Sequence, residues 1–141
     1  MTGWLALITA AVLVLIALIH VYWALGGRSA LGAAVPEIEG RAAFRPGRLA
    51  TLAVAAALLV AALLIATTGQ LIKSPLPPAV ARLLSYCLGA VFIARAIGDF
   101  RLVGFFKRVR GSAFARLDSA VYAPLCLALG VAALLVGYGV D

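Results

Sequence analysis

A chain of 141 residues that is 65% hydrophobic and only 12% charged has too little polar surface to cover a water-soluble globule. Its net charge of +7 comes from 12 Lys and Arg against 5 Asp and Glu. The composition therefore predicts that lipid is the main solvent of this chain. The length leaves room for one integral membrane domain, residues 1–141, and for no second domain.

Four apolar runs follow one another along the chain, each close to the roughly 20 residues that cross a hydrocarbon core. Backbone polar groups in lipid must be satisfied within each segment, so these runs predict helices and not the short alternating strands of a barrel. The loops between them are short, which favours antiparallel neighbours. We predict an all-α fold, a four-span transmembrane antiparallel helix bundle, with spans at about 3–25, 49–68, 79–100 and 119–139.

Positive charge gathers in the first and third loops, residues 26–48 and 101–118, whereas the opposite side carries Lys73, with Arg82 just inside the third run. By the positive-inside rule, we predict a multi-pass protein of the bacterial cytoplasmic (inner) membrane, with both loops in the cytoplasm and both termini outside. The loop cations that decide this orientation are Arg28, Arg41, Arg45, Arg48, Arg101, Lys107, Arg108, Arg110 and Arg116.

These cations flank membrane spans and do not lie on a folded polar surface, so nucleic acid is not expected as a partner. The third loop mixes Phe105 and Phe106 with cations, as segments at a membrane interface do. Juxtamembrane cations are each worth about 1 kcal/mol near an anionic lipid surface. We therefore expect membrane lipids as partners, with anionic headgroups at Lys107, Arg108 and Arg110. The same residues also fit a mouth that draws anionic substrates toward the bundle.

Polar groups inside the spans are the candidates for a functional site, because a charge at the bilayer centre costs at least about 2.5 kcal/mol. At 1.5 Å per residue, His20, Arg95 and Tyr122 each lie roughly 6 to 7 Å inside the cytoplasmic ends of their helices. Asp99 follows Arg95 by four residues, and Asp118 precedes Tyr122 by four. Each of these pairs therefore shares one helix face.

We expect these groups to converge on one inward-facing site. In this geometry Asp99 or Asp118 neutralises Arg95, and hydrogen bonds from the remaining polar groups complete a network. The alternative is that Arg95 snorkels to the interface, while the two aspartates are ordinary helix-end residues in contact with loop cations. The predicted ligand-binding residues are His20, Trp23, Arg95, Asp99, Asp118 and Tyr122.

Metal and cofactor chemistry is not predicted. Several convergent His, Cys or carboxylate ligands would be needed, and the chain has one His and two Cys. Haem with two axial histidines is not possible from a single such chain. Cys87 and Cys126 come out roughly 6 Å apart along the membrane normal, if each lies about 12 Å from its own entry face. A disulfide between them stays open, and inert apolar packing is the preferred interpretation.

Several short motifs are spread over nearly the whole chain. They are HVYWALGG (20–27), VPE (35–37), FRPG (44–47), the stretch from Arg95 through GDF (98–100), VGFFK (103–107), FARLD (114–118) and YAPLCL (122–127). Together they resemble a family of small bacterial membrane proteins, domain of unknown function 3995. The resemblance implies four spans and the pairing of these motifs, but it implies no activity.

Three functional classes fit this pattern. The preferred one is binding of an amphiphilic or anionic lipid-like molecule in a cytoplasm-facing pocket between helices, with Arg95 holding the head. The second is a membrane enzyme that uses His20 as acid or base, oriented by Asp118 or Asp99. The third is an accessory or oligomeric scaffold subunit, whose partner is a second copy or another membrane protein. Whether any reaction is catalysed stays open.

Overall fold

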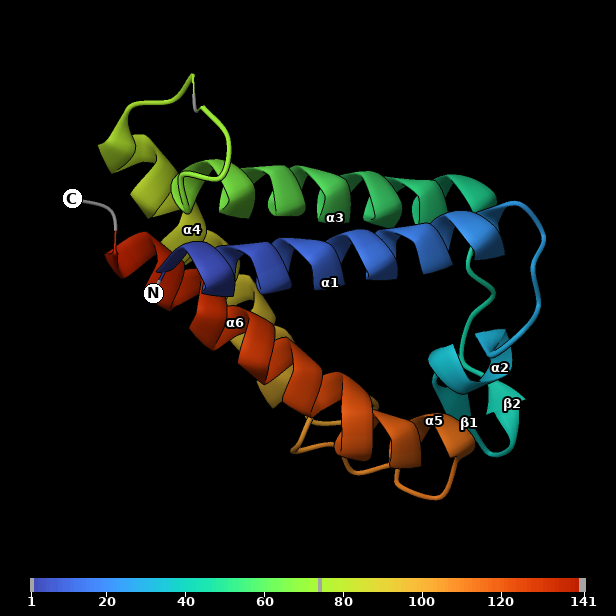
Figure 1. Cartoon of the computed structure of the whole chain (residues 1–141). Helices are drawn as coiled ribbons and strands as arrows, with labels where there is room; N and C mark the ends of the chain where they lie inside the picture. The colour runs from blue at the N-terminus through green and yellow to red at the C-terminus, as the bar shows by residue number, and fades with distance from the viewer. Residues whose placement is uncertain (1, 74, 140–141) are drawn as a thin grey trace.

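The computed structural model describes residues 2–73 and 75–139, and within them it confirms the all-α, four-span bundle (Figure 1). In this part of the chain, four helical stretches are long and apolar enough to cross a membrane, so the protein is a multi-pass membrane protein. These stretches are α1 (Thr2–Ala24), α3 (Arg48–Thr68), α4 (Pro78–Ile97), and a last span made of α5 (Ala113–Leu117), the π-helical turn η1 (Asp118–Tyr122) and α6 (Ala123–Tyr138).

The long helices pack as two pairs. α1 lies along α3 and α4 lies along α6, and the pairs meet near the ends of the chain and diverge toward the first and third loops (Figure 1). Small residues allow close contact where the helices meet. A side chain at Gly89 or Gly130 would collide with the facing helix, and one at Gly139 would collide with Thr2. The core shared by the pairs contains Leu13, Ile65, Leu129 and Val136.

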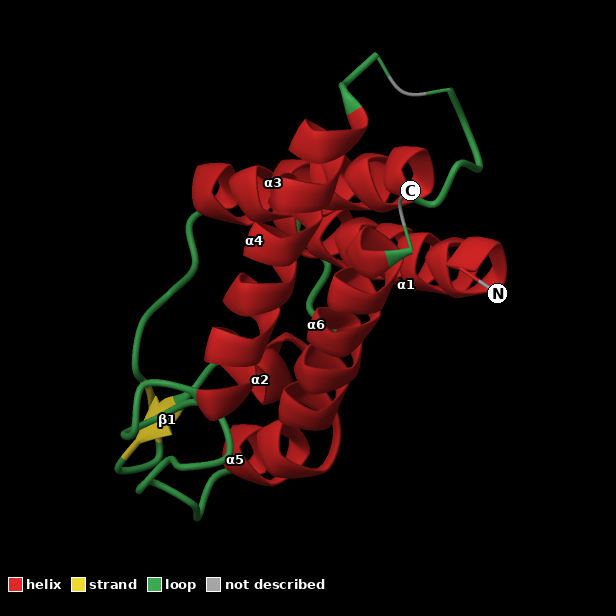
Figure 2. Cartoon of the chain, turned by 90° about the vertical axis from the view of Figure 1, so that its left-hand side faces the viewer, coloured by secondary structure: helices red, strands yellow, loops and turns green. Residues whose placement is uncertain are grey.

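The first loop contains small elements of its own, namely α2 (Leu31–Ala34) and an antiparallel hairpin of β1 (Glu37–Ile38) and β2 (Arg41–Ala42). These elements sit beside α5, as Figure 2 shows from a second direction. The first and third loops therefore lie together at one end of the bundle, opposite the end where Thr2 meets Gly139.

Two span boundaries differ by more than one residue from those expected from hydropathy. α4 ends at Ile97 and not at Phe100, because Gly98 adopts a left-handed φ of +92° and turns the chain out of the helix. The last span begins earlier, at Ala113, because the Ser112 hydroxyl accepts a hydrogen bond from the Ala115 amide at 3.0 Å and caps the helix. Both boundaries are set by capping residues, to which hydropathy is insensitive.

Candidate functional site

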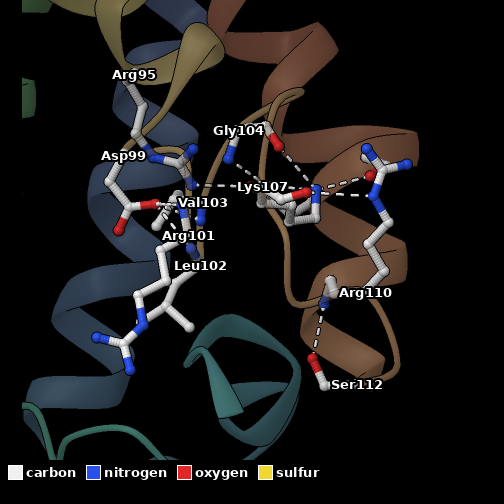
Figure 3. Close-up of polar contacts among 12 residues, drawn as sticks. Arg95, Asp99, Arg101, Leu102, Val103, Gly104, Lys107, Arg110 and Ser112 are labelled. Carbon is white, nitrogen blue, oxygen red and sulfur yellow. Dashed lines mark hydrogen bonds and ion pairs between the residues drawn. The ribbon is translucent and has the colours of Figure 1, made fainter. Parts of the chain in front are cut away.

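A buried ion cluster lies at the loop end of the α4–α6 pair, around Asp118. This carboxylate begins η1 and is fully buried. Its Oδ1 atom lies 2.9 Å from Arg95 Nη2, while Oδ2 lies 3.0 Å from Lys107 Nζ and accepts the Gly104 amide at 2.7 Å (Figure 3). A buried charge is tolerated when it is paired and hydrogen-bonded in this way.

Lys107 is an interior residue of this cluster, with only 2% of its surface exposed. Its ammonium group donates to the Gly104 carbonyl at 2.9 Å and to Ser119 Oγ at 2.7 Å, besides Asp118. All three donors of the lysine are thus used within the protein. The lipid headgroup contact expected for Lys107 does not fit this burial, because the loop turns the side chain inward to compensate Asp118.

Arg95 is held by Asp118 on one side only. Its Nη2 atom makes the ion pair, whereas the buried Nη1 atom has no hydrogen-bond partner. The cluster contains two cations, Arg95 and Lys107, and one carboxylate, so it carries a net positive charge. Asp99 and Asp118 were the two partners expected for Arg95. The structure pairs Arg95 with Asp118.

Asp99 organises the turn that follows α4. Its Oδ1 atom accepts the backbone amides of Arg101, Leu102 and Val103 at 2.9, 2.7 and 3.0 Å (Figure 3). These hydrogen bonds, that from Arg101 first, stabilise the carboxylate and lower the pKa of Asp99 below its ordinary value, against a smaller opposing effect of desolvation. Asp99 is exposed and makes none of the contacts of Asp118.

His20 and Trp23 lie on the other helix pair, near the end of α1. His20 Nδ1 is 2.8 Å from the Ile16 carbonyl, and the two rings pack edge to face with centroids 5.2 Å apart. A carbonyl only accepts, so Nδ1 carries the proton and Nε2 is the acceptor of the neutral ring. The Trp23 indole donates to the Ser29 carbonyl at 2.9 Å.

These two rings line a pocket of about 350 Å³ between α1, α3 and the first loop. α1 contributes the two rings, α3 contributes one face, and α2 and the segment before α3 complete the wall. Most of the wall is apolar, and its cation is Arg45. The residues around the pocket are His20, Trp23, Leu31, Ala34, Val35, Phe44, Arg45, Pro46, Gly47, Ala50, Thr51 and Val54.

Tyr122 connects the two helix pairs at their loop ends. Its hydroxyl donates to the Ala33 carbonyl of α2 at 3.1 Å, and its ring lies 6.0 Å from that of Phe114. The side chain thus fixes the first loop on the last span.

The six residues predicted for one site are distributed over several places. Arg95 and Asp118 are in direct contact, His20 and Trp23 share the pocket, and the remaining two, Asp99 and Tyr122, hydrogen-bond to loop backbone.

Sequence reasoning missed the burial of Lys107 and the position of Phe44 and Arg45 on the pocket wall. From its place in the sequence Lys107 is expected at the lipid surface, because a loop lysine is normally exposed. The sequence signal for the pocket was the pattern Phe44, Arg45, Pro46 and Gly47 directly before α3, where a turn folds back under the bundle.

Among residues 2–73 and 75–139, no group of three or more His, Cys, Asp or Glu side chains is placed to hold a metal ion. Cys87 is exposed on α4, Cys126 is partly buried on α6, and both are free thiols.

Comparison with known proteins yields a family and no activity. No curated protein and no solved structure matches the chain. One family does match, over residues 13–133, which include the ion cluster and the whole pocket. The chain belongs to the family described as protein of unknown function (DUF3995).

Proposed function

We propose that this membrane protein binds an amphiphilic small molecule with an anionic head in the pocket between α1, α3 and the first loop. The observation that carries the proposal is the chemistry of the wall. It joins an apolar surface to the guanidinium of Arg45, which makes no hydrogen bond or ion pair with another described residue. A cation left unpaired beside an apolar hollow suits a ligand with a tail and a negative end.

The apolar part of the pocket suits the tail of such a ligand. Leu31 and Val35 come from the first loop, Phe44 from the segment before α3, and Val54 from α3 itself. The volume of about 350 Å³ lies in the range of roughly 300 to 1,000 Å³ that is usual for small-molecule sites. Trp23 adds an aromatic face held in place by its hydrogen bond to Ser29.

The head of the ligand would lie at Arg45, with His20 beside it. Arg45 offers a planar set of donors that matches a carboxylate or phosphate. His20 adds a donor at Nε2 when the ring is protonated, since Nδ1 is already used on the Ile16 carbonyl. The anionic head is assigned to Arg45 in place of Arg95, because Arg95 already pairs with Asp118 whereas Arg45 has no ion-pair partner among the described residues.

The enzyme alternative receives less support from the geometry. It requires a carboxylate to orient His20, and both candidates are engaged elsewhere. Asp118 is bound to Arg95 and Lys107, and Asp99 accepts backbone amides. The Ile16 carbonyl orients the imidazole instead.

We further propose that both loops, 26–48 and 101–118, face the cytoplasm of a bacterial inner membrane. The excess of loop cations supports this orientation by the positive-inside rule. The pocket then opens toward the inner leaflet. Fusing alkaline phosphatase or green fluorescent protein to the C-terminus tests the orientation. Active phosphatase and a dark fluorescent fusion are expected, and the reverse pattern would contradict it.

Native mass spectrometry of gently solubilised protein tests ligand binding. We expect wild-type protein to carry a copurifying amphiphile, which Arg45→Gln or Phe44→Ala loses. Arg41→Gln is the matched control, because Arg41 lies on β2 in the same loop and outside the pocket wall. Protein that carries no such mass, or an amphiphile retained equally by Arg45→Gln and Arg41→Gln, would refute the proposal.

A further inference from the structure

We infer that the third loop forms a separate binding surface for anionic phospholipids of the surrounding bilayer. This surface, the aromatic–arginine surface, consists of Phe100, Arg101, Phe106, Arg108 and Arg110. It lies directly after α4, on residues that do not line the ligand pocket. The inference is therefore independent of the proposed amphiphile site.

Two aromatic rings form the apolar part of the aromatic–arginine surface. Phe100 and Phe106 are 58% and 61% exposed, and their rings lie 6.2 Å apart. Phe100 also has a φ of +61°, a left-handed conformation that is rare for a bulky side chain. The chain thus adopts a costly backbone and still leaves the ring outside the core. Aromatic rings at this level of a membrane protein insert among lipid headgroups.

The positive charge of the surface is only partly compensated within the loop. Between residues 98 and 118 the sequence has two acidic residues, Asp99 and Asp118. Asp118 is buried in the ion cluster, and Asp99 Oδ1 accepts three backbone amides. The Arg101 guanidinium extends away from the ion cluster (Figure 3).

The remaining arginines of the surface are also exposed. Arg108 makes no side-chain hydrogen bond or ion pair with another described residue, and Arg110 donates through Nε to the Lys107 carbonyl at 3.2 Å. Exposed guanidinium groups match the phosphates of anionic lipids.

The loop is held in shape before any lipid binds. The Phe105 amide donates to the Ala96 carbonyl of α4 at 2.8 Å, and the Arg108 and Val109 amides donate to the Arg101 carbonyl at 3.1 and 3.0 Å. The buried Lys107 fixes the middle of the loop on Asp118. A preformed surface loses little freedom on binding, which favours retention of a lipid through purification.

Lipid titration followed by native mass spectrometry tests the inference. Detergent-solubilised protein is titrated with phosphatidylglycerol or phosphatidylcholine of the same chain length. We expect the variant R101Q/R108Q/R110Q to bind phosphatidylglycerol more weakly, by about fivefold for each arginine, and phosphatidylcholine unchanged. The control R41Q/R48Q/R82Q removes the same charge from exposed sites elsewhere and should lose much less affinity for phosphatidylglycerol. Equal losses in the two triple variants, or no loss in the first, would overturn the inference.

Two further measurements separate the parts of the surface and the source of the anion. Phe100→Ala/Phe106→Ala should weaken binding of both lipids, because ring insertion does not depend on headgroup charge, and unchanged binding would contradict insertion. Inorganic phosphate at equal concentration should not displace phosphatidylglycerol; displacement would assign the arginines to a free anion and overturn the lipid assignment. Arg45→Gln should leave this titration unchanged, which keeps the outcome distinct from that of the pocket.

Discussion

At the loop end of the bundle, the two helix pairs differ in whether their polar side chains are paired with one another. In the α4–α6 pair, Arg95 and Lys107 both bind Asp118, and the third loop buries Lys107 and Asp118 while Arg95 stays partly exposed. In the α1–α3 pair, His20 and Trp23 bind only nearby backbone, and Arg45 stays unpaired beside a hollow. The comparison shows that depth within a helix does not decide the role of a polar residue. The loop that folds over the residue decides it.

The largest expected effect comes from removing the carboxylate of the closed cluster. Asp118→Ala leaves the buried Lys107 ammonium and the Arg95 guanidinium without their anion, so we expect a loss of about 3 to 5 kcal/mol in the free energy of unfolding. Unfolding of the purified protein in detergent measures it. Glu37→Ala is the control, because the Glu37 carboxylate makes no hydrogen bond or ion pair with another described residue. Equal free energies of unfolding for the two variants would show that the ion cluster does not stabilise the α4–α6 pair.

A smaller loss is expected at the turn that carries the third loop back to the cluster. Gly98 has a φ of +92°, and a Cβ atom there would collide with the Val103 carbonyl. Gly98→Ala should therefore cost at least the roughly 1 to 2 kcal/mol of a left-handed residue. Gly111→Ala is the control, since a Cβ at Gly111 meets no atom within 4 Å. The same detergent unfolding assay compares them, and similar midpoints would contradict the assigned collision.

The connection between the two halves should have a modest effect. Tyr122→Phe removes the hydrogen bond to the Ala33 carbonyl, which is worth about 0.5 to 1.5 kcal/mol. Hydrogen exchange of the α2 amides should become faster while that of α6 stays as it is. Tyr138→Phe, at an exposed position, should change neither. If α2 exchanges at the wild-type rate in Tyr122→Phe, the first loop is held by other contacts.

The smallest effect is a pH dependence confined to the turn after α4. The lowered pKa of Asp99 means that the folded turn favours the carboxylate. Its contribution to stability is present above the unfolded pKa of about 3.9 and is lost as the pH falls through the lower folded value. Protection of the Arg101, Leu102 and Val103 amides, corrected for intrinsic exchange, should fall below about pH 4. Asp99→Asn should show no such fall, and a parallel fall would assign the effect elsewhere.

The sequence predicted the membrane bundle well, because span length and apolar composition are local properties. The helix ends were less predictable, since Gly98 and Ser112 act through backbone geometry that hydropathy does not record. For the site, the contact of Arg95 with Asp118 was one of the two alternatives drawn from spacing. The burial of Lys107 was not foreseeable, because it depends on how the loop between residues 98 and 112 folds.

By itself, the sequence determined that this chain lies in lipid, that it crosses as four helices, and where its cations are concentrated. Each of these follows from composition and from residues close together along the chain. Only the tertiary structure decided which polar groups meet. It closed the third loop over Asp118 and brought His20, Trp23 and Arg45 to the wall of one pocket. Those contacts join residues from different segments, and their energies depend on burial and geometry that arise only when the helices and loops pack together.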